Sequence, residues 1–297
     1  MIIAGPTGVG KTTLALRLAE KFGGEIVGAD AFQIYRGLSI LTAQPTLGQL
    51  AEVSHHLIGS VDPSESYDAG RYAREALPIL EAIVARGRTP IVVGGTGLYL
   101  KALLGCLDEL PENDPDLREK FASLDLPTLA ELLRNADSGA LALIDPANRR
   151  RVERALEIVI LTGRPLSESR TTGMTAVTPP GVMALLLTRD REELHTRIAA
   201  NVTAMFDHGV EEEVTALPGD KIGPTAAMTL GLREIRALLR GELTRDAAVE
   251  TITTATRRYA KRQMTWFRNQ HSFPKLDLST MKSEELAFEE ALRLITR

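Results

Sequence analysis

The feature that most constrains the fold of this chain is a glycine-rich stretch close to its start. Gly5 to Thr12 has the sequence GPTGVGKT, which fits the pattern G-x-x-x-x-G-K-[ST] of a phosphate-binding loop. The apolar residues Met1 to Ala4 favour a strand before it, and Lys11 to Gly24 favours a helix that ends on glycines. A strand before the loop and a helix after it are the context in which such a loop binds phosphate, so the stretch predicts an α/β sheet.

Each part of this loop suits an anionic ligand. The glycines allow a tight turn that aims backbone N–H groups inward, and the helix that follows adds the positive end of its dipole. Lys11 supplies a cation, and the hydroxyl of Thr12 can bind Mg²⁺. The residues expected to bind phosphate groups are Gly5, Pro6, Thr7, Gly8, Val9, Gly10, Lys11 and Thr12.

The loop alone leaves the ligand open. A switch GTPase would also carry an N-K-x-D motif, and the sequence has none. A hydrolysing ATPase usually has an acidic residue on a later strand, whereas the strand expected at residues 89–95 ends in Gly94-Gly95-Thr96. The loop therefore suits a diphosphate ligand, and the catalytic carboxylate of the protein should lie elsewhere in the chain.

The order of apolar and amphipathic segments predicts the fold class. Strand-like patterns at 2–5, 24–30 and 89–95 alternate with helix-like patterns at 11–24 and 67–87, which is typical of a doubly wound parallel sheet. Residues 111–180 are charged and helical, and a strand-like pattern returns at 182–188. We expect a P-loop α/β core over 1–110 and 181–297, with a helical subdomain inserted over 111–180.

Composition limits the classes of partner. No apolar run approaches the ~20 residues of a membrane helix, and the single cysteine, Cys106, excludes an intrachain disulfide. These features predict a cytoplasmic protein without a membrane segment, and we expect a monomer. The net charge of −4 disfavours nucleic acid as a partner, but two local clusters, at 149–154 and 257–268, are basic enough to bind it.

A carboxylate stands where the second strand should end. Ligands of doubly wound sheets bind outside the carboxyl ends of the strands, so Asp30 should share one edge with the loop and the Gly94–Thr96 turn. Position alone leaves a catalytic role and a helix-capping role equally open. Gln33 and Tyr35 offer an amide and a ring for contact with a base, whereas the His55–His56 pair suits a structural role.

Together these segments resemble the tRNA dimethylallyltransferases, also called tRNA isopentenyltransferases. The matching segments, in order, are GPTGVGKT, GADAFQIYRGLSILTAQPT, HHLIGSVDPSESYDAGRYAREA, PIVVGGTGLYLKALL, RVERALEIVILTGRPLSE, GLREI and TRRYAKRQMTWFR. The resemblance implies transfer of a dimethylallyl group from dimethylallyl diphosphate to N6 of the adenosine 3′ to the anticodon. The tRNAs would be those that read codons beginning with U, with Mg²⁺ as cofactor and pyrophosphate as product.

The resemblance also implies roles for particular residues. Asp30 would be the general base, since the amino group of adenine is a poor nucleophile, and Thr96 and Lys11 would complete the catalytic set. Arg197 would lie near the diphosphate. The residues expected to contact tRNA are Asp30, Ala31, Phe32, Gln33, Thr96, Arg150, Arg151, Gly231, Arg233, Arg258 and Arg262. Trp266 and Phe267 are expected in the core.

The chain departs from the family pattern at some positions. Gln44 stands where the family usually has a lysine, and Asn148 stands where it usually has an acid. No Cys/His cluster resembles the zinc-finger extension of eukaryotic relatives, which indicates a bacterial-type enzyme. The alternatives are an adenylate isopentenyltransferase, a small-molecule kinase with ATP on the loop, and a non-catalytic RNA-binding module.

Overall fold

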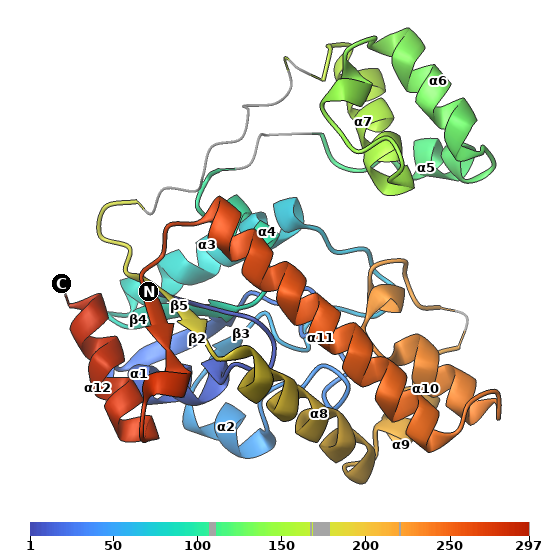
Figure 1. Cartoon of the computed structure of the whole chain (residues 1–297). Coiled ribbons are helices and arrows are strands. Elements are labelled where there is room, and N and C mark those ends of the chain that lie inside the picture. Colours follow the sequence, from blue (N-terminus) through green and yellow to red (C-terminus); the bar gives the residue numbers. More distant parts are fainter. Residues whose placement is uncertain (107–110, 167, 169–178, 220, 297) are drawn as a thin grey trace. The chain divides into compact units, whose positions relative to one another are not determined.

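The chain divides into two units, one built around a sheet and one made of helices. The computed structural model describes residues 1–106, 111–166, 168, 179–219 and 221–296. One unit comprises Met1–Leu104 and Thr175–Arg297, and the other comprises Gly105–Met174 (Figure 1). The first unit holds the sheet and the second is made of helices.

A six-stranded sheet in the order β3-β2-β4-β1-β5-β6 forms the centre of the first unit. Every pair of neighbouring strands is parallel, which confirms the expected doubly wound α/β fold. The strands are β1 (Ile2–Ala4), β2 (Gly24–Gly28), β3 (His55–His56), β4 (Thr89–Gly94), β5 (Ala184–Thr188) and β6 (Lys275–Asp277). Because β1 lies between β4 and β5, its three residues are all buried.

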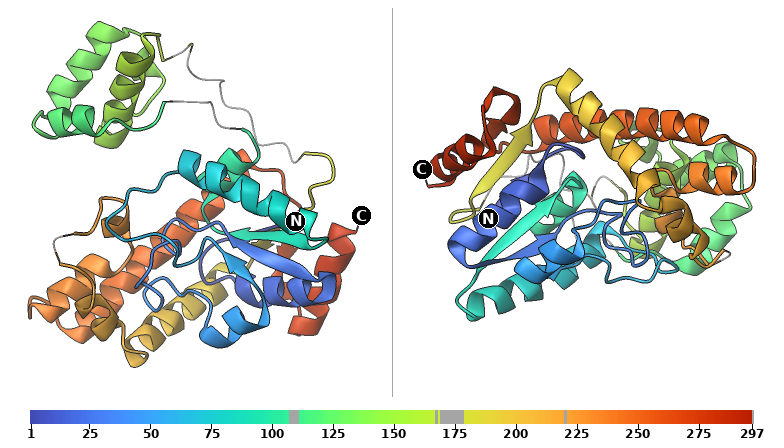
Figure 2. Two further views of the ribbon diagram at one scale, coloured as in Figure 1. Left: turned by 180° about the vertical axis from the view of Figure 1, so that it is seen from behind. Right: turned by 90° about the horizontal axis from the view of Figure 1, so that it is seen from below.

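Helices cover both faces of this sheet. Helices α3 (Ala69–Ala85) and α4 (Gly97–Leu103) lie on one face, and α1 (Lys11–Phe22) and α12 (Glu284–Ile295) lie on the other (Figures 1 and 2). The remaining helices are α2 (Leu47–Glu52), α8 (Arg191–Asp207), α9 (Val210–Thr215), α10 (Leu232–Leu239) and α11 (Arg245–Gln270), with 3-10 turns at Ala226–Met228 and Leu278–Thr280. Pro78 lies inside α3.

Local sequence explains where the first helix begins and ends. Gly10 precedes α1 with φ 107°, and Gly23 ends it with φ 57°, both in the left-handed region that favours glycine. The buried residues Leu14, Ala15, Leu18 and Ala19 recur at helical spacing along the face of α1 turned to the sheet. The helix therefore starts directly at the phosphate loop.

The second unit has a hydrophobic core of its own. It contains α5 (Pro115–Ala122), α6 (Leu126–Ala136), a 3-10 turn at Ala140–Ala142 and α7 (Arg149–Thr162). The buried side chains include those of Phe121, Leu129, Leu133, Val152, Leu156 and Ile158. Asp114, Asp125 and Asn148 cap the three helices, so the asparagine that replaces the usual acid still serves as an N-cap.

Among the described residues, no helix combines the length and the apolar character needed to span a lipid bilayer.

Candidate active site

Four loops meet at the carboxyl edge of the sheet. The phosphate loop follows β1, the Gly95–Thr96 turn follows the adjacent strand β4, and Asp30 follows β2 on the far side of β4. Arg189 follows β5 on the other side of β1. Parallel strands end at one edge, so residues far apart in sequence become neighbours there.

Lys11 lies beneath the phosphate loop. Its Nζ donates hydrogen bonds to the carbonyl oxygens of Gly5 at 3.0 Å and Pro6 at 2.8 Å. Burial of the ammonium group lowers the pKa of Lys11 to about 8, although the negative charge of Asp30 acts in the opposite direction. The loop thus holds a cation whose charge depends on pH near neutrality.

Two arginines flank the loop on the β5 side. Arg197 Nε donates to the carbonyl oxygen of Gly8 at 2.9 Å, and Arg189 Nε donates to that of Val9 at 3.2 Å. A Cβ built on Gly10 would lie 3.7 Å from Arg189 Nη2 and 3.9 Å from Arg197 Nη2. Arg197 therefore stands beside the loop as expected, and Arg189, which the sequence did not single out, stands with it.

Asp30 both caps a turn and presents an open oxygen. Its Oδ1 accepts hydrogen bonds from the backbone N–H groups of Phe32 at 3.0 Å and Gln33 at 3.4 Å. Within the described part of the chain, no hydrogen bond reaches its Oδ2. The two roles that the sequence left open are therefore compatible, because one oxygen fixes the side chain and the other can accept a proton.

Thr96 ties the end of β4 to the residues around Asp30. Its Oγ1 accepts a hydrogen bond from the N–H of Ala31 at 3.0 Å, and its own N–H donates to the carbonyl of Ala29 at 3.2 Å. A Cβ on Gly94 would lie 2.0 Å from the Ala29 oxygen, so only glycine permits this approach. The two strand ends therefore form one rigid edge.

Two glutamine side chains stabilise the turn after Asp30 by hydrogen bonds to backbone carbonyls. Gln33 Nε2 donates to the carbonyls of Thr42 and Ala43, and Gln44 Nε2 donates to those of Gln33 at 2.8 Å and Tyr35 at 2.9 Å. Gln44 thus supports the turn instead of supplying a charge. The expectation that Tyr35 offers a ring to a base is wrong, because its side chain is fully buried.

Helix α9 holds the same region through one carboxylate. Glu213 Oε1 accepts from Ser39 Oγ at 2.8 Å and from the N–H of Ile40 at 2.7 Å, and its Oε2 accepts from the N–H of Leu41 at 2.8 Å.

The histidine pair His55–His56 is structural, as expected. His56 Nε2 lies 2.7 Å from the buried Glu25 carboxylate, and His55 Nδ1 lies 2.7 Å from the Val53 oxygen.

Helix α11 adds two residues that sequence reasoning missed. The Tyr259 ring lies 6.0 Å from that of Phe32, and burial together with the Asp30 charge raises the pKa of the Tyr259 hydroxyl. The Gln263 side chain is buried between the phosphate loop and the Gly95 turn. Both belong to the segment TRRYAKRQMTWFR, in which the sequence pointed only to the basic residues Arg258 and Arg262 as contacts for tRNA.

The same helix carries the expected basic residues outward. Arg258 and Arg262 are exposed and four residues apart, and the Arg262 guanidinium lies 5.5 Å from the centre of the Tyr259 ring. Phe267 is fully buried and belongs to the core as expected, whereas Trp266 is only half-buried and packs closely on Gly97.

The other expected tRNA contacts differ in exposure. In the second unit Arg150 and Arg151 are exposed, whereas Arg149 donates to the Phe121 and Leu124 carbonyls. In the first unit Arg233 is exposed and forms an ion pair with Glu234 at 2.8 Å. Gly231 is buried, with φ 90° at the start of α10. Its conformation gives it a structural role, and contact of these residues with tRNA stays a prediction.

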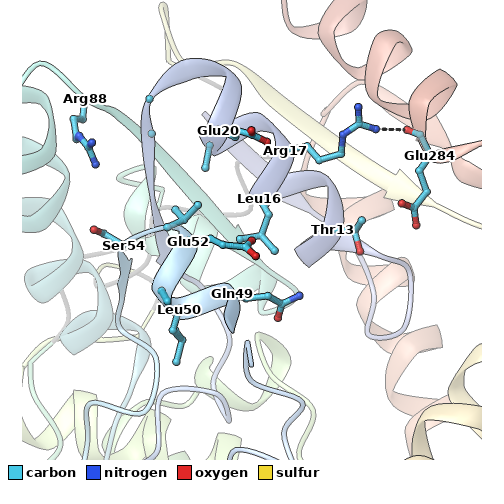
Figure 3. A pocket seen from close by; sticks show the side chains of 15 residues that line it. Thr13, Leu16, Arg17, Glu20, Gln49, Leu50, Glu52, Ser54, Arg88 and Glu284 are labelled. Carbon is cyan, nitrogen blue, oxygen red and sulfur yellow. Dashed lines mark hydrogen bonds between the residues drawn. The ribbon is translucent and has the colours of Figure 1, made fainter. Parts of the chain in front are cut away.

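Two hollows lie near α1. One of about 860 Å³ is lined by Thr13, Leu16 and Glu20 of α1 and by Gln49, Leu50 and Glu52 of α2 (Figure 3). No residue of the phosphate loop lines it, so it is separate from the site. A smaller one of about 250 Å³ lies beside the loop, with Gly10, Arg189 and Arg197 in its wall.

The part of the chain that the structure describes has no group of three or more His, Cys, Asp or Glu side chains that could hold a metal ion. Mg²⁺ commonly binds through one or two protein oxygens, substrate phosphates and water. The Thr12 hydroxyl at the start of α1 fits that mode. It offers a single protein oxygen, so a Mg²⁺ ion held there would need phosphate oxygens to complete its coordination.

These features define a P-loop α/β protein in which a phosphate-binding loop and a strand-end carboxylate share one edge of the sheet, an arrangement suited to group transfer. The family models narrow the class. The model described as IPP transferase matches residues 33–270, and the one described as isopentenyl transferase matches residues 1–60. The chain belongs to the IPP transferase family, which confirms the resemblance found in the sequence.

Individual relatives agree with this assignment. The tRNA dimethylallyltransferase 1 of Citrifermentans bemidjiense is 44% identical over 90% of this chain and 88% of its own length. The crystal structure of the full-length tRNA isopentenylpyrophosphate transferase from Bacillus halodurans is 33% identical, with a TM-score of 0.70 over 98% of this chain and 94% of its own. A eukaryotic dimethylallyltransferase, captured acting on tRNA, matches with a TM-score of 0.83, 28% identity, 99% of this chain and 77% of its own.

Proposed function

We propose that this chain transfers a dimethylallyl group from dimethylallyl diphosphate to N6 of the adenosine 3′ to the anticodon, in tRNAs that read codons beginning with U. The observation that carries the proposal is the phosphate loop beside Asp30 and Thr96 at one sheet edge. The family assignment and the names of the relatives support it. Pyrophosphate is the second product.

The transfer exchanges one bond for another. A bond forms between N6 of the adenine and the terminal carbon of the allyl group, and the bond from that carbon to the diphosphate oxygen breaks. The N6 proton passes to Asp30, whose Oδ2 is open while its Oδ1 is fixed by the turn. A base is needed there because the lone pair of the amino group is delocalised into the ring.

Charge that develops on the leaving diphosphate is stabilised from several directions. The loop N–H groups, the α1 dipole and Lys11 act from one side, and Arg189 and Arg197 act from the β5 side. Thr12 is the residue that would hold Mg²⁺, which when bound neutralises part of the diphosphate charge. The loop thus holds a leaving group instead of an energy source.

The acceptor adenosine has to leave the anticodon-loop stack to reach Asp30, at a cost of a few kcal/mol. Ala31, Phe32, Gln33 and Thr96 would border it. The exposed pairs Arg150–Arg151 and Arg258–Arg262 would bind phosphates, and Gly231 and Arg233 would complete the tRNA surface. We further propose that the enzyme works as a monomer in the cytoplasm, where tRNA is its partner.

The test is a transfer assay with labelled dimethylallyl diphosphate and Mg²⁺. Unmodified tRNA, AMP, and ATP with a small acceptor are offered in separate reactions. We expect label in tRNA. Label only in AMP would favour an adenylate isopentenyltransferase, ATP turnover a kinase, and tRNA binding without transfer an RNA-binding module.

The Asp30→Asn variant tests the role of the base. Asparagine can keep the Oδ1 contacts to Phe32 and Gln33 but cannot take a proton. We expect transfer to fall by about 10²–10⁴-fold, which is the usual contribution of a general base, with tRNA affinity unchanged. A turnover rate near that of the wild-type enzyme would exclude Asp30 as the base.

A further inference from the structure

The buried side chain of Gln263 lies between two catalytic segments. Its Oε1 accepts a hydrogen bond from the N–H of Thr7 in the phosphate loop at 2.9 Å. Its Nε2 donates to the carbonyl oxygen of Gly95 at 2.9 Å. An amide has a donor at one end and an acceptor at the other, and the two partners fix which end is which. Gln263 therefore bridges the loop after β1 and the turn after β4.

Gly95 leaves room for this bridge. A Cβ at that position would lie 2.3 Å from Gln263 Nε2 and 3.0 Å from the Gly5 oxygen. Three residues further along α11, Trp266 packs against Gly97 in the same way. Positions three apart lie on the same face of a helix, so this face of α11 rests directly on the two glycines that flank Thr96.

The bridge lies where the sheet no longer fixes the two segments. The ladder between β1 and β4 ends at the pair Ala4 and Gly94. Beyond it, the described residues give no backbone hydrogen bond between residues 5–8 and residues 95–97. Gln263 supplies a side-chain connection just past the last ladder pair. It thereby sets the spacing between the segment that holds the donor and the segment that holds Thr96.

We propose that Gln263 is a positioning residue that keeps the phosphate loop at the correct distance from the Asp30–Thr96 edge. The inference rests on the proposed function, in which the donor lies on one of these segments and the acceptor adenine at the other. Transfer requires the reacting atoms to be about 3–3.5 Å apart and aligned. If the phosphate loop moved away from the Thr96 turn, the enzyme would still bind both substrates, but the reacting atoms would be too far apart or misaligned.

Two variants and one control separate positioning from simple loss of stability. Gln263→Met keeps the length of the side chain and removes both hydrogen bonds, and Gln263→Asn keeps the amide but is too short to reach both partners. The matched control is Gln270→Met on the same helix. It removes a hydrogen bond of equal length, from Lys101 Nζ to Gln270 Oε1 at 2.9 Å, between α11 and α4.

The variants and the control are compared by single-turnover transfer from labelled dimethylallyl diphosphate to tRNA, by substrate affinities, and by thermal unfolding. We expect both Gln263 variants to transfer about 10–100-fold more slowly, as a misplacement of about 1 Å does. Donor and tRNA affinities should stay within threefold of the original, and the control should keep its rate.

The outcomes distinguish the two proposals. If the unmodified chain transfers no label to tRNA, the proposed function fails. If it does transfer label, and Gln263→Met and Gln263→Asn keep the original rate, the positioning role is overturned. A lower rate that is fully explained by weaker donor binding, or that Gln270→Met shares, also overturns it. Should Gln263→Met not fold, Gln263→Asn decides alone.

Discussion

The charge on Lys11 provides a test of the site's electrostatics. Burial lowers its pKa to about 8, partly offset by Asp30, so the free enzyme should lose this cation within an accessible pH range. A group with a pKa of 8 is about 90% protonated at pH 7 and about 10% at pH 9. An exposed lysine, with a pKa near 10.4, would keep more than about 95% of its charge at pH 9.

At saturating tRNA, the value of kcat/KM for the donor reports ionisations of the enzyme before the donor binds. We therefore expect it to fall about tenfold between pH 7 and pH 9, in step with the protonated fraction of Lys11. The donor contributes little to this change, because the last pKa of a phosphate group is about 6. Lys11→Arg should have a lower value throughout but a flat profile, since a guanidinium group stays charged over this range.

The measurement uses initial rates at limiting labelled donor and saturating tRNA, from pH 6.5 to 9.5 at constant ionic strength. A profile that stays flat to pH 9.5 in the unmodified enzyme would show that the lysine is not buried as described. An equal decline in Lys11→Arg would assign the ionisation to another group. Either result would refute the reasoning.

Two further predictions concern the supports of the site and the acceptor surface. Glu213→Ala removes the acceptor of two backbone N–H groups and one hydroxyl, and should lower the free energy of unfolding in urea by about 2–3 kcal/mol. The control is Glu212→Ala, at the exposed neighbouring residue. If Glu213→Ala lowered the free energy of unfolding by less than about 0.5 kcal/mol, the Glu213 hydrogen bonds would not stabilise this region as described. Replacing both Arg150 and Arg151 with alanine should weaken tRNA binding and reduce its salt slope by about 1.5–2. An unchanged affinity and slope would place those two arginines outside the interface.

Much of the fold could be predicted because its signals are local. The phosphate loop contains its own glycines and lies between a strand and a helix, and the helical spacing of apolar residues marks α1 and α3. The apolar runs at β4 and β5 are short and bounded, as in a buried parallel sheet. Strand β3 was missed because its two residues, His55 and His56, are too few to show a period.

The contacts that assemble the site are not local, and the sequence alone did not show them. Gln263 forms hydrogen bonds with Thr7 and Gly95, and Glu213 forms one with Leu41, although these partners lie far earlier in the sequence. A glutamine or a glutamate on a helix face carries no sign of its distant partner. The burial of Tyr35 was not predicted for the same reason, because its hydroxyl donates to the backbone carbonyl of Glu65, which lies in a later segment.

The position of β1 within the sheet has a consequence for synthesis on the ribosome. One edge of β1 pairs with β4, but the other must wait for β5, which begins at Ala184, about ninety residues after Gly94. At 5–20 residues per second, that wait lasts roughly 5–20 s. The second unit can bury its own apolar residues during this interval, while the edge of β1 stays open to other nascent chains. The order of synthesis thus sets when the phosphate loop can first take its final shape.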